Sequence, residues 1–151
     1  MELDSGRLVF PGGKQEFKPF AKEMKKLQNN WAVEMSQQYR HAQPSARKWA
    51  WLSDQIIDVL ISTDTETTMA FVLGLDHARD EAYMLAIQAT QIMHKYGAAI
   101  YRPGDEDTRD PRSFVNESQD IMARKKEEWD EWLAGADEYR KRHGVDPPPP
   151  F

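Results

Sequence analysis

The sequence predicts an all-α protein with four or five helices in a bundle, an irregular N-terminal arm and a polyproline C-terminal tail. Apolar residues recur at steps of three and four over several long segments, the spacing of an amphipathic helix. Proline and glycine separate these segments. The 151 residues suffice for one core but not for two full domains. We therefore expect an arm (1–18), a helical domain (19–143) and a tail (144–151).

The N-terminal arm lacks helical periodicity. Its apolar residues Leu8, Val9 and Phe10 are followed by Pro11-Gly12-Gly13, a strong turn signal. This pattern fits a short strand or an apolar plug. Either form would dock on the arm's own domain or on a neighbouring molecule.

Two helices are expected next. Pro19 suits a first helical turn, and an apolar stripe carries this helix over about 19–41. Pro44 opens the second helix, which ends where Ser62-Thr63-Asp64 breaks the pattern. The two stripes consist of Phe20, Met24, Leu27, Trp31, Met35 and Tyr39, and of Trp49, Leu52, Ile56, Val59 and Leu60, with Trp51 and Ile57 widening the second.

Residues 64–96 keep helical spacing throughout, either as one helix or as two that meet near 74–76. Thr63 and Glu66 have the spacing of a capping box at its start. Its apolar positions include three alanines, which let a neighbouring helix approach closely; these are Ala78, Ala82 and Ala89. Gly97 is a natural C-cap.

Residues 98–110 are expected to form a loop, followed by a last helix over about 111–143. Asp110 and Pro111 have the pattern of an N-cap and a first helical position. Gly144 should cap the helix, and four consecutive prolines then favour a polyproline tail.

Composition excludes several classes of chemistry. The chain has no cysteine, which removes disulfides, thiol catalysis, iron–sulfur clusters and Cys-type zinc sites. It has neither an apolar run of membrane-spanning length nor a signal-peptide pattern, so we expect a cytoplasmic protein without membrane contact. Its net charge of −5 is unevenly distributed: residues 1–50 hold nine basic and five acidic side chains, and the remainder is acidic.

The candidate metal ligands in the sequence are carboxylates, in one place together with a histidine. His77, Asp80 and Glu81 share one helix face, but a single histidine beside an arginine favours a solvated surface. Pairs such as Glu117 and Asp120 are similar to the magnesium-holding pairs of all-α nucleoside triphosphate pyrophosphohydrolases. Here they lie along one helix among lysines and arginines, a pattern that favours ion pairs. We therefore predict no catalytic residue, metal or cofactor.

Two alternatives remain open. A metal-dependent all-α phosphohydrolase would have to gather five carboxylates, those of Asp54, Asp58, Asp76, Asp80 and Glu81. A nucleic-acid-associated accessory protein would use the basic first third with its interleaved Trp31, Trp49 and Trp51. The pI near 5.4 disfavours this second alternative.

The C-terminal residues 145–151, Val-Asp-Pro-Pro-Pro-Pro-Phe, carry one resemblance. They resemble the acidic tip of bacterial single-stranded DNA-binding proteins, which ends in Pro-Phe and docks into basic, apolar pockets of partner enzymes. The resemblance stops there, because the chain has one Asp instead of a cluster and lacks that family's β-barrel pattern. It implies partner docking, whereas a simple helix-stopping, solubilising tail fits equally well.

The sequence thus favours a non-catalytic helical interaction module: an assembly, adaptor or inhibitor protein of the kind that phages and mobile elements encode. We expect a protein partner or a homo-oligomer, with nucleic acid as a weaker possibility. The predicted partner-binding residues are Lys18, Lys22, Lys25 and Lys26 on the first helix, Trp129 and Trp132 on the last, and Pro150 and Phe151 in the tail.

Overall fold

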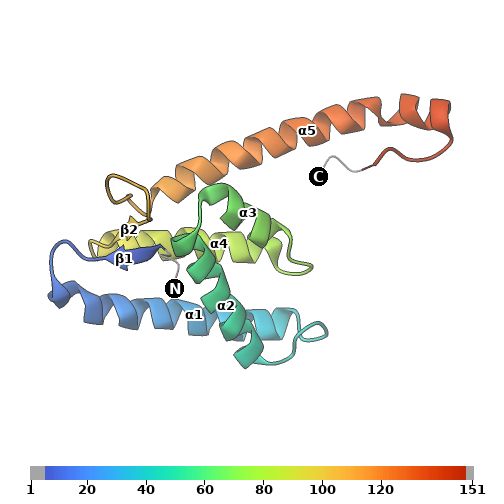
Figure 1. The fold of residues 1–151 in the computed structure, drawn as a ribbon. Coiled ribbons are helices and arrows are strands. Elements are labelled where there is room, and N and C mark those ends of the chain that lie inside the picture. Colours follow the sequence, from blue (N-terminus) through green and yellow to red (C-terminus); the bar gives the residue numbers. More distant parts are fainter. Residues whose placement is uncertain (1–5, 149–151) are drawn as a thin grey trace, which may run out of the picture. The chain divides into compact units, whose positions relative to one another are not determined.

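The computed structural model describes residues 6–148 and confirms an all-α fold. The described residues contain five α-helices, one 3₁₀ helix and one two-stranded sheet (Figure 1). The elements are β1 (Arg7–Val9), η1 (Lys14–Glu16), α1 (Phe17–Gln38), α2 (Ala46–Ser62), α3 (Thr65–Leu73), α4 (Arg79–Lys95), β2 (Ala99–Tyr101) and α5 (Ser113–His143).

The chain forms two compact units, residues 1–115 and residues 116–151. The first unit holds every element up to the start of α5, and the second holds the rest of α5 with the C-terminal segment. The division into 1–18, 19–143 and 144–151 inferred from the sequence stays a prediction.

The core of the first unit lies among α1, α2, α3 and α4. In it α2 contacts each of the other three helices, and α4 also contacts α1 and α3. The stripes expected on α1 and α2 supply much of this core, whereas Met69 and Met93 lie outside the stripes expected from the sequence. The largest fully buried apolar residues are Trp49, Met35, Ile56, Leu60, Met69, Leu85 and Met93.

Aromatic side chains connect α1, α2 and α4. The rings of Trp31 and Trp49 meet edge to face at 5.7 Å, and Tyr39 lies 5.8 Å from Trp49. Trp49 Nε1 donates to the Gln43 carbonyl at 2.7 Å, and Trp31 Nε1 donates to the Glu81 carbonyl at 3.1 Å. Both buried indoles therefore satisfy their polar atom, as buried tryptophans require.

The N-terminal arm docks on its own domain as a strand. β1 pairs antiparallel with β2, so that Leu8 lies opposite Ile100. The loop expected over 98–110 is therefore wrong at its start. Ala99, Ile100 and Tyr101 are too few to show a period of two, and their partner strand lies some ninety residues earlier.

Gly6 sets the distance between the arm and α2. It is buried, and a Cβ at this position would collide with the backbone carbonyl oxygen of Ile61. The atoms nearest to such a Cβ are all backbone atoms of Ile61 and Ser62, so no flexible side chain could move aside to make room for it. The glycine therefore lets β1 pass close to the end of α2.

Residues 64–96 form two helices, α3 and α4, which confirms the second of the two alternatives. The chain turns between them, and Ala78 adopts a left-handed conformation with φ 62° immediately before α4. Ala78, Ala82 and Ala89 are all buried, as the close approach of neighbouring helices demands.

The capping box expected at Thr63 is wrong by one residue. Asp64 is the N-cap of α3, and its Oδ1 accepts the Thr67 N–H at 2.7 Å. Thr63 instead caps the end of α2, where its hydroxyl donates to the Val59 carbonyl at 2.6 Å. Each of the two residues caps a different helix, because only Thr63 and Asp64 separate the end of α2 from the start of α3.

Replacing Asp64 by alanine should destabilise the first unit by about 1 kcal/mol, because it removes this cap. The Thr67 backbone bond lowers the pKa of Asp64 below 3.8. The folded carboxyl is therefore the stronger acid, so its contribution is full above pH 3.8 and is lost as the pH falls through the lower folded pKa. Urea unfolding at pH 7 and pH 3 measures the loss of unfolding free energy at each pH. Asp64→Asn is the control, because asparagine can still cap the helix. Equal losses for Ala and Asn would contradict the assignment.

Helix α5 begins at Ser113, two residues after the expected start. Asp110 still caps this end, since its Oδ1 accepts the Arg112 N–H at 2.9 Å. Hydrogen bonds from the Arg112 side chain and backbone lower the pKa of Asp110 to about 2. At the other end Gly144 has φ 72° and its N–H donates to the Arg140 carbonyl, as a C-capping glycine should.

Candidate functional site

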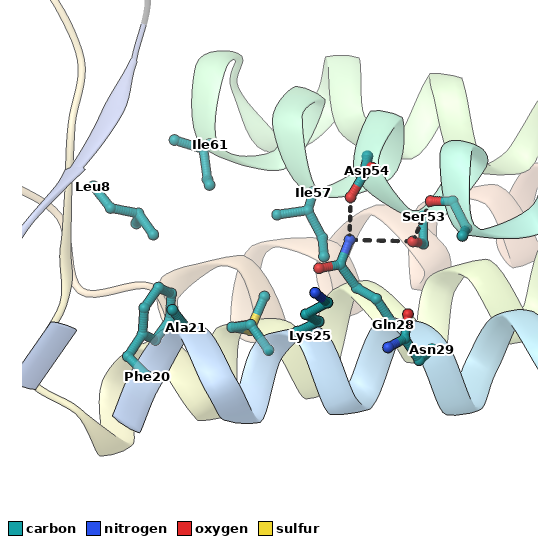
Figure 2. A pocket seen from close by; sticks show the side chains of 12 residues that line it. Leu8, Phe20, Ala21, Lys25, Gln28, Asn29, Ser53, Asp54, Ile57 and Ile61 are labelled. Carbon is teal, nitrogen blue, oxygen red and sulfur yellow. Dashed lines mark hydrogen bonds between the residues drawn. The ribbon is translucent and has the colours of Figure 1, made fainter. Parts of the chain in front are cut away.

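A groove of about 480 Å³ opens between α1 and α2 and reaches β1 (Figure 2). Most of its lining is apolar, and each of the three elements contributes to it. The apolar lining consists of Leu8 from β1, Phe20, Ala21 and Met24 from α1, and Ala50, Ile57 and Ile61 from α2. Since the Gly6 backbone lies against Ile61, the arm closes one end of this groove.

The polar lining of the groove is internally hydrogen-bonded. Figure 2 shows Gln28 reaching from α1 to α2, where its Nε2 donates to Ser53 Oγ at 3.1 Å and to Asp54 Oδ1 at 2.5 Å. The buried Ser53 hydroxyl donates to the Ala50 carbonyl at 2.6 Å. These groups hold the two helices together, and neither a histidine nor a second carboxylate stands beside the serine to activate it.

The four predicted lysines all lie on α1 and are exposed. Lys18, Lys22 and Lys25 are spaced by four and three residues, so they share one face, with Lys26 at its edge. Lys25 also lines the groove. Among residues 6–148 none of the four forms a hydrogen bond or an ion pair. We call this set the lysine face.

Another side of α1 is neutralised within the fold. Glu23 accepts hydrogen bonds from Tyr96 and from Lys95, the latter at 3.1 Å. The Tyr96 bond, and after it the Lys95 bond, hold the pKa of Glu23 below its ordinary value. On α1, the lysine face thus keeps its positive charge available for a partner.

The two predicted tryptophans of α5 form a stacked pair. Their ring centroids are 5.0 Å apart and the planes differ by 25°. Trp132 Nε1 donates to the Pro148 carbonyl at 2.6 Å. The other two predicted residues of this surface, Pro150 and Phe151, lie outside the described residues.

The structure gives no support to a phosphohydrolase site. Within residues 6–148 no group of three His, Asp or Glu side chains lies close enough to hold a metal ion. Two of the five carboxylates accept hydrogen bonds from side chains outside their own helix. Asp54 accepts from Gln28, and Glu81 accepts from the Tyr39 hydroxyl at 3.0 Å.

The aromatic side chains expected to stack on nucleic-acid bases are mostly inaccessible. Trp31 and Trp49 are buried in the core, whereas Trp51 is 63% exposed. A stacking platform needs several exposed rings along a basic groove. A single exposed tryptophan does not supply one.

Sequence reasoning located the lysine face but not the groove beside it. Leu8, Gln28 and Ser53 come from three separate segments, and no spacing relates them. The one signal lay in Trp51 and Ile57, which widen the apolar stripe of α2: Ile57 is half-buried and lines the groove, whereas Trp51 is exposed and does not line it. One of the two widening residues thus marks the groove.

No helix in the described part of the chain is long and apolar enough to cross a membrane. Comparison of the chain with known protein families, curated proteins and solved structures gives no match. The geometry of the two surfaces is therefore the basis for any functional conclusion.

Proposed function

We propose that this chain is a non-catalytic protein-interaction module whose α1–α2 groove binds an acidic, amphipathic segment of a protein partner. One observation carries the proposal: an open apolar groove is lined by Lys25, one of four exposed lysines of α1 that have no ion-pair partner among the described residues.

The two parts of this surface have different physical roles. The apolar lining gains free energy when it leaves water, and a groove of about 480 Å³ lies within the roughly 300–1,000 Å³ range of ligand pockets. The lysines attract an acidic partner from a distance and reject a basic one. Together they specify a segment with apolar residues on one side and Asp or Glu on another.

The proposal predicts the outcome of a peptide-display selection on the full chain. Random 16-residue peptides that bind should be enriched in apolar residues spaced by three and four and in Asp or Glu. The double variant Lys22→Glu/Lys25→Glu should weaken the selected peptides by about 10- to 100-fold, because attraction at two positions becomes repulsion. Fluorescence anisotropy at 50 mM and 300 mM salt measures the affinities.

Lys48→Glu is the matched control, since Lys48 is exposed on α2 but does not line the groove. It should leave the affinity within about twofold. Selected peptides that carry net positive charge, or that bind the double variant as well as the parent, would overturn the proposal. Tight binding of labelled single-stranded DNA at 50 mM salt, lost in the double variant, would support the nucleic-acid alternative instead.

The last helix with its tail is the second surface of the proposed module. Its stacked tryptophans support this role, because aromatic side chains are enriched at protein interfaces. The cytoplasmic location, the oligomeric assembly and the kinship with phage proteins stay predictions.

A further inference from the structure

The segment that follows α5 returns along that helix. After Gly144 the chain reverses direction, and residues 145–148 run back beside the end of α5 (Figure 1). Two contacts hold this segment. Arg140 Nε donates to Asp146 Oδ1 at 2.5 Å, and Trp132 Nε1 donates to the Pro148 carbonyl at 2.6 Å.

These contacts lie on one face of α5. Trp132, Ala136 and Arg140 are spaced by four residues each, so they form a row along the helix. Ala136, in the middle of the row, is only 3% exposed although its neighbours on α5 are exposed. A chain segment lying along this face accounts for that burial. The tail is therefore seated over two helical turns.

The chemistry of this contact is suited to proline. Each proline lacks an N–H, so a polyproline segment offers carbonyl oxygens that no internal hydrogen bond occupies. An indole combines an apolar ring for the pyrrolidine with one N–H for such a carbonyl, and aromatic grooves recognise proline-rich segments in this way. Trp129 stacks on Trp132 and enlarges the aromatic surface. Arg140 adds charge recognition of the acid that precedes the prolines.

We infer that the face of α5 bearing Trp129, Trp132 and Arg140 is a binding site for a proline-rich segment of a protein partner, with an acidic residue before the prolines. The chain's own Asp146–Pro148 occupies the site until that partner displaces it. This inference rests on the proposed function only in that it treats the chain as an interaction module. Its residues all belong to the second unit and none lines the groove.

Because the tail is covalently attached beside the site, it competes with any partner peptide for binding there. A segment joined by a short linker acts at an effective concentration of about 1 mM. If a free peptide binds the vacated site with a Kd of about 0.1 mM, the tethered tail weakens its apparent binding about tenfold. A partner must therefore bind tightly, or be present in several copies, to open the site.

The test uses the full chain and a synthetic peptide of residues 144–151, Gly-Val-Asp-Pro-Pro-Pro-Pro-Phe. The double variant Pro147→Gly/Pro148→Gly keeps the tail but removes its polyproline character. Nitrogen-15 labelling of tryptophan follows the Trp132 indole N–H by NMR, assigned through its loss in Trp132→Phe. We expect this signal to shift in the double variant, to return when peptide is added, and to report about tenfold tighter peptide binding than in the parent chain.

Two further variants distinguish specific recognition of the peptide by Trp132 from nonspecific binding to an exposed aromatic ring. Trp132→Phe, placed in the double variant, keeps an aromatic ring but removes the N–H donor. It should weaken binding of the fluorescently labelled peptide at least tenfold, as measured by anisotropy because the Trp132 indole signal is lost. Trp51→Phe, at an exposed tryptophan of α2, should not change peptide binding. Equal binding by parent and double variant, no binding by either, or indifference to Trp132→Phe would each overturn the inference.

The outcome is separable from that of the proposed function. Lys22→Glu/Lys25→Glu changes the lysine face and the lining of the groove at Lys25, and should leave the indole signal of Trp132 unmoved. Acidic peptides selected on the groove should likewise bind the proline-to-glycine variant with unchanged affinity. Either proposal can thus be overturned without affecting the other.

Discussion

Replacing Trp49 by alanine should cost the first unit about 3–5 kcal/mol of unfolding free energy. The side chain is 1% exposed, and the rings of Trp31 and Tyr39 both pack against it. The substitution leaves a large cavity and also frees the Gln43 carbonyl, which now accepts from the Trp49 indole. A small helical domain has a total stability of about 5–15 kcal/mol, so the loss is a large share of it.

Circular dichroism and urea unfolding measure this effect. The melting temperature should fall on the order of 10–20 °C. Trp49→Phe should lose less, because it keeps an aromatic ring while giving up the hydrogen bond. Trp51→Ala, two residues along the same helix, should stay within about 0.5 kcal/mol of the parent chain because that ring is exposed. Similar losses at the two positions would show that the stripe does not define the core.

The contrast between Trp49 and Trp51 explains what the sequence could predict. Spacing places Trp49 on the apolar stripe of α2, and its burial confirms this; it also places Trp51 among the residues that widen the stripe, but that ring is 63% exposed. The all-α fold and the extent of each long helix follow from the same periodicity, since burying one face is what stabilises a short helix. Cap positions were less accurate because Thr63 and Asp64 both have side chains suited to capping, and only their local geometry decides between them.

Long-range pairing is what the sequence could not reveal. The β1–β2 ladder joins residues some ninety positions apart, and each strand has only three residues. The groove has the same difficulty, since Leu8, Gln28 and Ile61 meet only after the helices pack. The lysine face was predictable because it lies on a single helix. Its lack of carboxylate partners among residues 6–148 was not, because that depends on how the other helices are placed.

The alanines of α4 were also predictable as a close-packing surface, and they give the second large effect. Ala89→Leu should destabilise the first unit by about 1–3 kcal/mol, because extra methyl groups in a filled core force the helices apart. Ala89 is 0% exposed, and α4 contacts α1, α2 and α3 together. A shift of α4 therefore disturbs its packing against all three of these helices.

Helix propensity cannot produce this loss, since alanine and leucine are both strong helix formers. Gln88→Leu, one residue earlier on α4 and exposed, adds the same side chain outside the core and should change stability by less than about 0.5 kcal/mol. Chemical unfolding of the parent chain, Ala89→Leu and Gln88→Leu compares their unfolding free energies. If Ala89→Leu equals Gln88→Leu, the core has room for a leucine and the alanines do not set the helix spacing. If only Ala89→Leu unfolds early, the small side chains set the distance of α4 from the helices that pack against it.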